Sequence, residues 1–189
     1  MLSHNNRLIP VVLLLLLTAC AAKQEAPTPA ATFQRTSLAE SNCRKASDPG
    51  DPNDTPYLIC PGVAGYTLHV RSVESGRSSI DIVDPAGKAT PLNYHQTITT
   101  AMFAIGNDAE WRMEAGTPIA LITSIQAHED LTEPGKVTNS YSAIAKITTQ
   151  QVCVTDKLPQ QAPSEASIAR AADNAPNRPC LPTLTTPNQ

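Results

Sequence analysis

The sequence predicts a mainly β fold: a small antiparallel β-sandwich or barrel of six to eight strands, with a short C-terminal helix and two disulfides. Three observations support this prediction. Apolar residues alternate with polar ones through the middle of the chain, tight-turn motifs separate the alternating segments, and four cysteines flank them. Alternation is typical of strands with one buried face, and frequent tight turns favour antiparallel pairing.

The N-terminus has the layout of an export signal. A polar stretch that includes Arg7 precedes the apolar run Leu8 to Leu17. This run is about ten residues long, whereas a helix needs about twenty to cross a bilayer. The sequence therefore predicts a signal peptide over residues 1–19 rather than a permanent membrane span.

The apolar run ends in Leu17-Thr18-Ala19-Cys20. This segment resembles the lipobox of bacterial lipoproteins, in which the chain is cut just before a cysteine that is acylated. The resemblance implies lipidation at Cys20, with palmitate among the acyl chains, and a membrane partner held through that lipid. Because Ala21 rather than an acidic residue follows, it also implies the outer membrane, facing the periplasm. The alternative is an ordinary secretory signal with an incidental cysteine.

Composition divides the rest of the chain into three parts. Residues 20–41 are rich in Ala, Pro, Thr and Gln without an apolar period, which predicts a lipidated flexible tether. Residues 42–156 form the expected β-rich domain, and residues 157–189 form a Pro-rich tail. Within the tail, the window Ser164 to Ala175 holds good helix formers between prolines, and Ser164 is a suitable N-cap for a short helix.

Alternating segments define the expected strands and their buried faces. The apolar positions are Tyr66, Leu68 and Val70; Ile80 and Ile82; Trp111 and Met113; Ile119, Leu121, Thr123 and Ile125; and Tyr141, Ala143, Ala145 and Ile147, leading to Val152 and Val154. Two Pro-Gly turns separate some of them, over 84–87 and 133–136. Pro presets φ and Gly tolerates positive φ, so both sites suit tight reversals.

Four cysteines remain once Cys20 is assigned to lipid, an even number for an oxidising compartment. Four cysteines allow three pairings. We favour Cys43 with Cys60 and Cys153 with Cys180, because each pair lies at one end of the strand region and closes a short loop. Free buried thiols are the alternative. No metal site is expected, since zinc-type Cys and His spacing is absent from the sequence.

Charge and motifs narrow the function classes. Fourteen Lys and Arg against seventeen Asp and Glu give a net charge of −3 without a basic cluster, which argues against nucleic-acid binding. No Gly-x-Ser-x-Gly elbow, His-Glu-x-x-His, phosphate loop or dinucleotide fingerprint occurs in the sequence. The sequence therefore predicts no enzyme activity and no cofactor.

The remaining polar candidates have plain structural interpretations. His128-Glu129-Asp130 is expected to form a solvated turn, and His69 and His95 are expected to face outward on a strand and a loop. Oxygen-bearing residues at Asp48, Asp51, Asn53 and Asp54 match no EF-hand spacing. A turn-rich loop is the expectation there, with a calcium site as the alternative.

Two short motifs stand out in the body of the chain. Cys60-Pro61-Gly62-Val63-Ala64-Gly65-Tyr66 favours a closely packed start to a strand, and the lone Trp of Glu110-Trp111-Arg112 is expected in the core. Both motifs resemble segments of uncharacterised proteobacterial envelope proteins over about residues 40–155. The resemblance implies a shared fold and no particular activity.

These observations leave two classes of function. The first is a non-enzymatic binding or structural module, anchored by lipid in the envelope, with an envelope protein or glycan as partner. A lysozyme-inhibitor-like role belongs to this class by fold-level analogy. The second is an envelope hydrolase built from dispersed residues. A pocket that gathers His95, His128 or acidic groups would favour the hydrolase.

Overall fold

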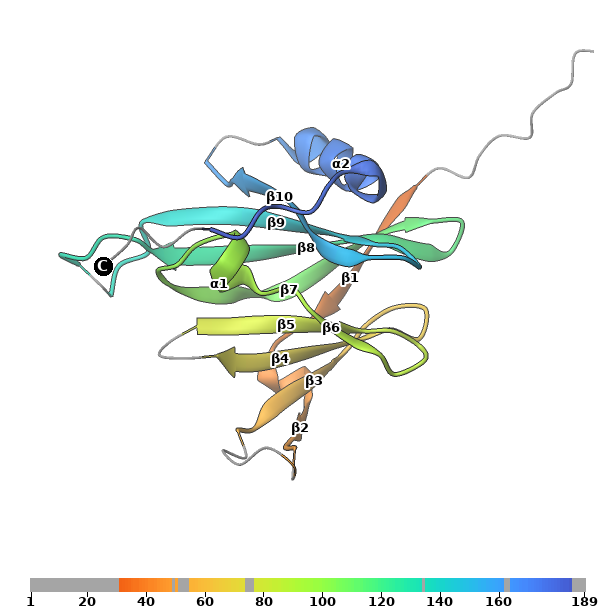
Figure 1. Ribbon diagram of the computed structural model, residues 1–189, viewed down its shortest axis with the longest axis horizontal. Coiled ribbons are helices and arrows are strands. Elements are labelled where there is room, and N and C mark those ends of the chain that lie inside the picture. The colour runs from red at the N-terminus through yellow and green to blue at the C-terminus, as the bar shows by residue number, and fades with distance from the viewer. Residues whose placement is uncertain are drawn as a thin grey trace, which may run out of the picture.

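Two five-stranded antiparallel sheets, packed face to face, form the computed structural model of the chain (Figure 1). The structure describes residues 31–48, 50, 55–73, 77–133, 135–161 and 164–184. Within them, the first sheet has the strand order β1-β7-β8-β9-β10. Its strands are β1 (Thr32–Ser37), β7 (Met102–Glu114), β8 (Thr117–His128), β9 (Asn139–Ile147) and β10 (Val152–Pro159).

The second sheet has the order β2-β3-β4-β5-β6. Its strands are β2 (Arg44–Ala46), β3 (Tyr57–Pro61), β4 (Thr67–Val73), β5 (Arg77–Val83) and β6 (Ala89–Pro91). The two sheets do not close into a barrel, so the sandwich is the correct one of the two predicted forms. The described residues hold ten strands rather than six to eight, because β2 and β6 have three residues each and are too short to show alternation in sequence.

The main core lies between the two sheets and includes most of the predicted alternating positions, but not Ile119, which is only partly buried because a register shift between β7 and β8 lies opposite it. Trp111 on β7 pairs in register with Leu121 on β8, and Leu68 on β4 pairs with Ile82 on β5. All four side chains are buried and belong to one apolar cluster. Burying a large apolar side chain contributes about 1.5–3 kcal/mol, so this layer supplies much of the driving force for folding.

Helices close two sides of the sandwich. The short α1 (Tyr94–Thr97) places Tyr94 between the sheets, where its hydroxyl lies 2.8 Å from the Thr123 hydroxyl. Burial raises the pKa of Tyr94 well above its ordinary value. One-turn 3₁₀ helices, η1 (Glu40–Asn42) and η2 (Ala175–Asn177), precede β2 and follow the C-terminal helix.

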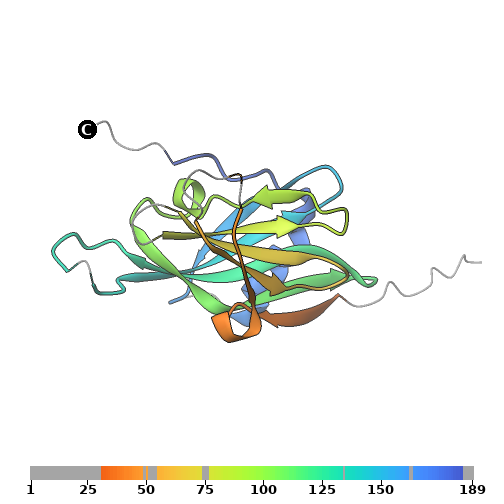
Figure 2. The ribbon, with the colours of Figure 1, turned by 90° about the horizontal axis from the view of Figure 1, so that it is seen from below.

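The predicted C-terminal helix is α2 (Glu165–Asn174), which covers the outer face of β8 and β9. Its predicted cap is confirmed, since the Ser164 side chain accepts a hydrogen bond from the Ser167 N–H. Ala171 and Ala172 pack there against Ala120, Ile122 and Ile144 in a second, smaller core. Seen from below, the β2–β6 sheet lies in front and α2 lies behind the first sheet (Figure 2).

Both predicted disulfides are confirmed. Cys43 binds Cys60 with a Cα–Cα distance of 4.3 Å, which joins the start of β2 to β3. Cys153 binds Cys180 with a Cα–Cα distance of 5.7 Å, which holds the segment after η2 against β10. In that segment the Leu181 N–H donates to the Val154 carbonyl at 2.7 Å. Each bridge contributes roughly 3 kcal/mol by constraining the unfolded chain.

The predicted range of the tether, 20–41, includes residues that belong to the folded domain. Residues Thr32–Ser37, inside the predicted range 20–41, form β1 and pair with β7 from Thr32 opposite Met113 to Ser37 opposite Asp108. Backbone hydrogen bonds rather than apolar burial hold this edge strand, because four of its six side chains are exposed. A strand of this kind has no alternation for sequence reasoning to detect. Residues 1–30, with the predicted signal peptide and Cys20, lie outside the described residues.

The predicted boundary between the domain and the tail also lies too early in the chain. β10 continues to Pro159, beyond the expected domain end at 156, and α2 packs onto the first sheet as part of the domain. In the described residues no helix is both long and apolar enough to cross a membrane.

The two ends of the sandwich differ in shape. One end of the sandwich holds the start of β1, the β5–β6 turn and the β9–β10 turn (Figure 1). At the opposite end the β8–β9 hairpin projects from the body, as both ribbon views show.

Candidate functional site

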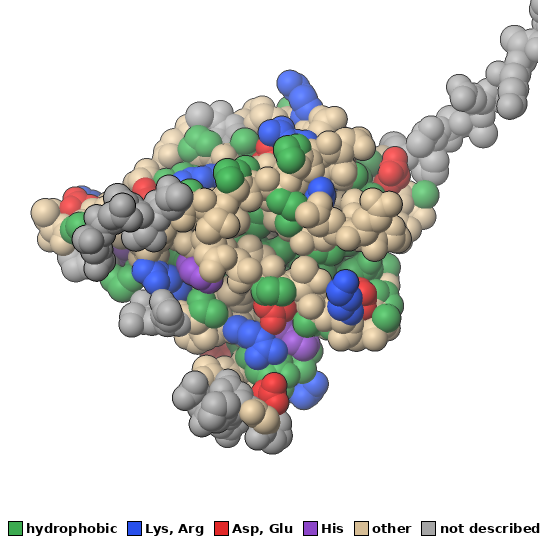
Figure 3. All heavy atoms as spheres, viewed as in Figure 1, with side chains coloured by type: hydrophobic (Ala, Val, Ile, Leu, Met, Phe, Trp, Pro, Cys, Tyr) green, Lys and Arg blue, Asp and Glu red, His purple; other side chains and the backbone are tan. Residues whose placement is uncertain are grey.

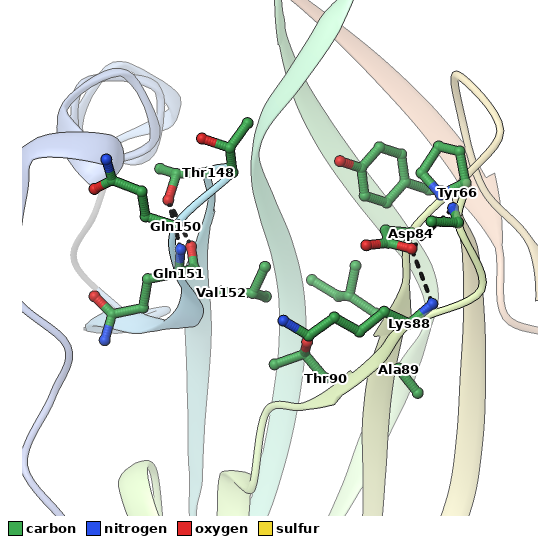
Figure 4. Close-up of a pocket in the computed structure, with 13 residues that line it drawn as sticks. Tyr66, Asp84, Lys88, Ala89, Thr90, Thr148, Gln150, Gln151 and Val152 are labelled. Atoms are coloured by element: carbon green, nitrogen blue, oxygen red, sulfur yellow. Dashed lines mark hydrogen bonds between the residues drawn. The ribbon is translucent and has the colours of Figure 1, made fainter.

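A groove opens between the two sheets at the end where the described chain begins. Its volume is about 660 Å³. One wall is the β5–β6 turn, residues 84–90, and the other is the β9–β10 turn, residues 148–152 (Figure 4). Ile82 and Val152 contribute apolar surface, and Tyr66 stands beside the first wall. We refer to this space as the groove.

The first wall is the predicted Pro-Gly turn. The Gly87 N–H donates to the Asp84 carbonyl at 2.9 Å, and Gly87 has a φ of 85°. The Asp84 carboxylate accepts the N–H groups of Ala86 and Lys88, each at 2.9 Å. Asp84 therefore fixes the shape of its own turn, as Asp side chains at this position commonly do.

Tyr66 is placed by the motif Cys60 to Tyr66. A tight turn over 63–66 carries a hydrogen bond from the Tyr66 N–H to the Val63 carbonyl, and Gly65 in this turn has a φ of 83°. A Cβ on Gly62 would lie only 2.8 Å from the Tyr66 carbonyl carbon and 3.1 Å from Trp111. Gly62 is thus required for the close packing predicted at this strand start, and that packing fixes Tyr66 at the groove.

The second wall is a turn that holds its own shape. The Thr148 hydroxyl donates to the Gln151 carbonyl at 2.8 Å and accepts the Gln151 N–H at 2.9 Å. Figure 4 shows the amide groups of Gln150 and Gln151 directed away from the opposite wall. The amides of Gln150 and Gln151 are therefore not directed at Lys88 on the other wall.

Several polar side chains of the groove have no protein partner. Within the described part of the chain, the Lys88 ammonium, the Tyr66 hydroxyl and the hydroxyls of Thr90 and Thr149 make no hydrogen bond or ion pair. Figure 4 shows the Lys88 side chain extended across the groove toward β10. These groups are solvated in the free protein and can exchange water for a ligand.

A second polar cluster lies at the opposite end, at the base of the β8–β9 hairpin. Glu129 accepts hydrogen bonds from the Thr99 hydroxyl at 2.8 Å, the Tyr141 hydroxyl at 3.0 Å and the Asn139 amide. Lys157 lies over the Tyr141 ring at 3.9 Å and donates to the Ile98 carbonyl at 2.6 Å. We call Thr99, Glu129, Asn139, Tyr141 and Lys157 the hairpin clamp.

The hairpin clamp corrects the expectation for Glu129. Sequence reasoning placed His128-Glu129-Asp130 in a solvated turn, whereas the Glu129 carboxylate is held by three donors from two segments, the one that follows α1 and β9. Burial alone would raise the pKa of Glu129, but the hydrogen bonds from Thr99, Asn139 and Tyr141 and the charge of Lys157 outweigh burial and lower it. Burial and the bond to Glu129 raise the pKa of Tyr141 to about 12. The carboxylate is therefore ionised and the phenol neutral at pH 7.

The outer face of the second sheet carries a third polar group of residues. The Arg71 guanidinium binds Asp81 at 2.7 Å and lies 4.0 Å from the centre of the Tyr57 ring. His69 packs against the same ring with the ring centres 5.1 Å apart. Burial and the Arg71 charge lower the pKa of His69. Figure 3 shows charged and His side chains gathered over this sheet.

The other predicted candidates do not converge. His95 lies on α1 rather than on a loop, and His128 ends β8. Within the described residues, no His lines the groove, the cavity between Val70 and Phe103, or the cavity between Glu110 and Gln160. Asp48 accepts the Gly50 N–H at 3.0 Å, and the other oxygen-bearing residues proposed for calcium, Asp51, Asn53 and Asp54, lie outside the described residues. Among described residues, no group of three His, Cys, Asp or Glu side chains is arranged to hold a metal ion.

Sequence reasoning found the turn and the glycine motif but not the groove. Lys88 and Thr90 are ordinary surface residues in sequence, and nothing in the pattern connects them to Thr149. Only the packing of the two sheets brings the 84–90 and 148–152 turns together. One sequence signal pointed toward the groove. The Tyr66 motif leads into β4 and the Pro-Gly turn at 84–87 follows β5, so antiparallel pairing of these strands places both segments at the same end of the sheet.

Comparison of the chain with protein-family models, with curated proteins and with solved structures finds no match. The resemblances to lipoproteins and to envelope proteins therefore stay predictions, and the case for function depends on the geometry of the groove.

Proposed function

We propose that this protein is a lipid-anchored, non-enzymatic binding module of the bacterial envelope and that the groove is its binding site. The observation that carries the proposal is the set of unpartnered polar side chains in the groove, Lys88, Tyr66, Thr90 and Thr149. A binding site needs a concave surface with a few polar groups free to orient a ligand, and the groove combines both.

The anchor follows from the lipobox-like segment at Cys20. Residues 20–31 separate that cysteine from β1, a length that spans at most about 40 Å when extended. The groove lies at the end of the sandwich where β1 begins, so the proposed anchor would keep it near the membrane surface (Figure 1). Replacing Cys20 with Ser should abolish incorporation of radiolabelled palmitate and release the protein from the membrane fraction. Continued labelling of the Cys20→Ser protein would contradict the lipid anchor.

The hairpin clamp is the strongest basis for the alternative, a hydrolase, because it brings Glu129, Tyr141 and Lys157 together. Its chemistry favours a structural role. Both Glu129 oxygens accept hydrogen bonds, the Tyr141 phenol stays protonated, and Lys157 donates to a backbone carbonyl. A general base needs a free lone pair within reach of a substrate proton.

Site-specific photocrosslinking in intact cells tests the proposed binding site. A photoreactive residue at Thr149, on the groove rim, should give a discrete crosslinked product. The control position is Gln126, an exposed residue on β8 away from the groove. Crosslinking at Gln126 as strong as at Thr149, or none at Thr149 and Thr90, would overturn the groove as the binding site.

A further inference from the structure

One positively charged side chain that lines the groove takes no part in the ion pairs of the described fold. Lys88 makes no ion pair within the described residues, and its side chain extends across the groove (Figure 4). Asp84 is the acidic residue among those that line the groove, but its carboxylate accepts the amides of its own turn. An anionic group on a ligand would therefore find the Lys88 ammonium available and would gain a charge-assisted hydrogen bond.

Tyr66 supplies a fixed aromatic surface in the same groove as this cation. Its ring lies 6.1 Å from the Trp111 ring at an angle of 54°. Trp111 is fully buried and donates from Nε1 to the Thr36 hydroxyl at 2.9 Å, so it gives Tyr66 a rigid support. Because an aromatic ring that is already held in place loses little conformational entropy on binding, Tyr66 favours contact with a flat apolar face of a ligand.

The dimensions of the groove argue against an extended peptide. Between β6 and β10, Cα atoms approach within 8 Å of each other. A strand inserted between two others needs about 9.6 Å, twice the ordinary strand spacing of about 4.8 Å. The edges of β6 and β10 therefore leave no room at this point for a peptide strand that pairs with both of them.

We propose that the groove binds a carboxylate-bearing glycan, with Lys88 as the contact for the carboxylate and Tyr66 as the platform for a sugar ring. The hydroxyls of Thr90 and Thr149 are free to exchange hydrogen bonds with sugar hydroxyls. The inference rests on the proposed function, because it names the ligand class of the same groove. A peptide of acidic residues alone, such as polyglutamate, offers the carboxylate but no rigid ring for Tyr66.

Calorimetric titration of the full chain in detergent tests the ligand class. Three probes separate the contributions: solubilised uncrosslinked peptidoglycan strands, whose carboxylates are on the peptide stems attached to the sugar chain; chitotetraose, a neutral sugar chain; and polyglutamate, an anion without sugar. The peptidoglycan strands should bind most tightly. Lys88→Gln should weaken their binding about tenfold, the loss of one charge-assisted hydrogen bond, while chitotetraose binding stays unchanged.

Two further variants complete the test. Tyr66→Leu should weaken both sugar probes, and Lys136→Gln, a surface Lys paired with Glu133 on the far hairpin, should change neither. The inference is overturned if the peptidoglycan strands do not bind, if Lys88→Gln leaves their affinity unchanged, or if polyglutamate binds as tightly. Crosslinking at Thr149 with no sugar binding would overturn the ligand class alone and leave the proposed binding site standing.

Discussion

The two polar clusters at opposite ends of the sandwich differ in how far the fold satisfies them. In the hairpin clamp, Glu129 accepts from three side chains, and Lys157 donates to a backbone carbonyl. In the groove, Lys88, Tyr66, Thr90 and Thr149 bond to no other described group. Polar groups that stabilise a fold are paired within it, whereas groups that bind a ligand must be free to change partners.

This contrast predicts opposite effects of mutation at the two ends. Substitutions in the hairpin clamp should reduce stability, because they leave partly buried donors without an acceptor. Substitutions of the unpaired groove side chains should affect binding and leave stability nearly unchanged. The glycine beneath the groove is the exception, since it belongs to the scaffold that places Tyr66.

The largest effect is expected for Gly62→Ala. Its new Cβ would press on the Tyr66 backbone and on Trp111, so the free energy of unfolding should fall by about 3 kcal/mol. Urea denaturation followed by Trp fluorescence measures this loss. Gly135→Ala is the matched control in the opposite hairpin, where an added Cβ meets nothing within 4 Å. Equal stability of both variants would show that the close approach at Gly62 is not a constraint.

Glu129→Gln should lower the free energy of unfolding by about 2 kcal/mol, because an amide cannot accept all the hydrogen bonds that the carboxylate accepts. Hydrogen exchange should show the loss at the base of the β8–β9 hairpin. The control is Glu133→Gln on the same hairpin, where the carboxylate forms only an exposed pair with Lys136. A Glu129→Gln protein as stable as Glu133→Gln would contradict the structural role of the hairpin clamp.

Acid should weaken the hairpin clamp. The pKa of Glu129 is lowered in the folded protein, so its contribution to stability is complete above the ordinary Glu pKa of about 4.3 and is lost as the pH falls below that value. Wild type should therefore lose more stability than Glu129→Gln between pH 5 and pH 3. Parallel pH profiles for the two proteins would show that Glu129 does not stabilise the fold through its charge.

The smallest effect on stability is expected for Lys88→Gln. Because Lys88 is exposed and makes no ion pair in the described structure, the free energy of unfolding should change by less than about 0.5 kcal/mol. Thermal denaturation of wild type and variant provides the measurement. A clear loss of stability would mean that Lys88 has a structural role that the contacts do not reveal.

Local features were predicted from sequence more successfully than long-range ones. Both disulfides, the turn at Asp84 to Gly87, the Ser164 cap and the burial of Trp111 were predicted because each depends on nearby residues or on one alternating strand. The edge strand β1 was missed because its side chains are mostly exposed. Neither the hairpin clamp nor the groove could be predicted, since each depends on how distant segments meet.

Glu129 illustrates the limit. In sequence it lies between His128 and Asp130, before a turn, and a solvated position is the natural prediction. Its partners Thr99, Asn139 and Tyr141 come from the segment after α1 and from β9. Antiparallel pairing of β8 with β9 brings Asn139 opposite Ala127, two residues from Glu129. A register of this kind is fixed by the whole sheet and not by the local sequence.

Hydrogen exchange of the full chain in isolated envelopes, compared with the purified chain in detergent, tests the central claim most directly. The groove is proposed to be occupied in the envelope, so amides in 84–92 and 148–152 should exchange more slowly there, while those in 128–141 should exchange equally in both samples. Slower exchange at 128–141 with no change at 84–92 and 148–152 would contradict the account, because it would place the partner on the hairpin and not in the groove.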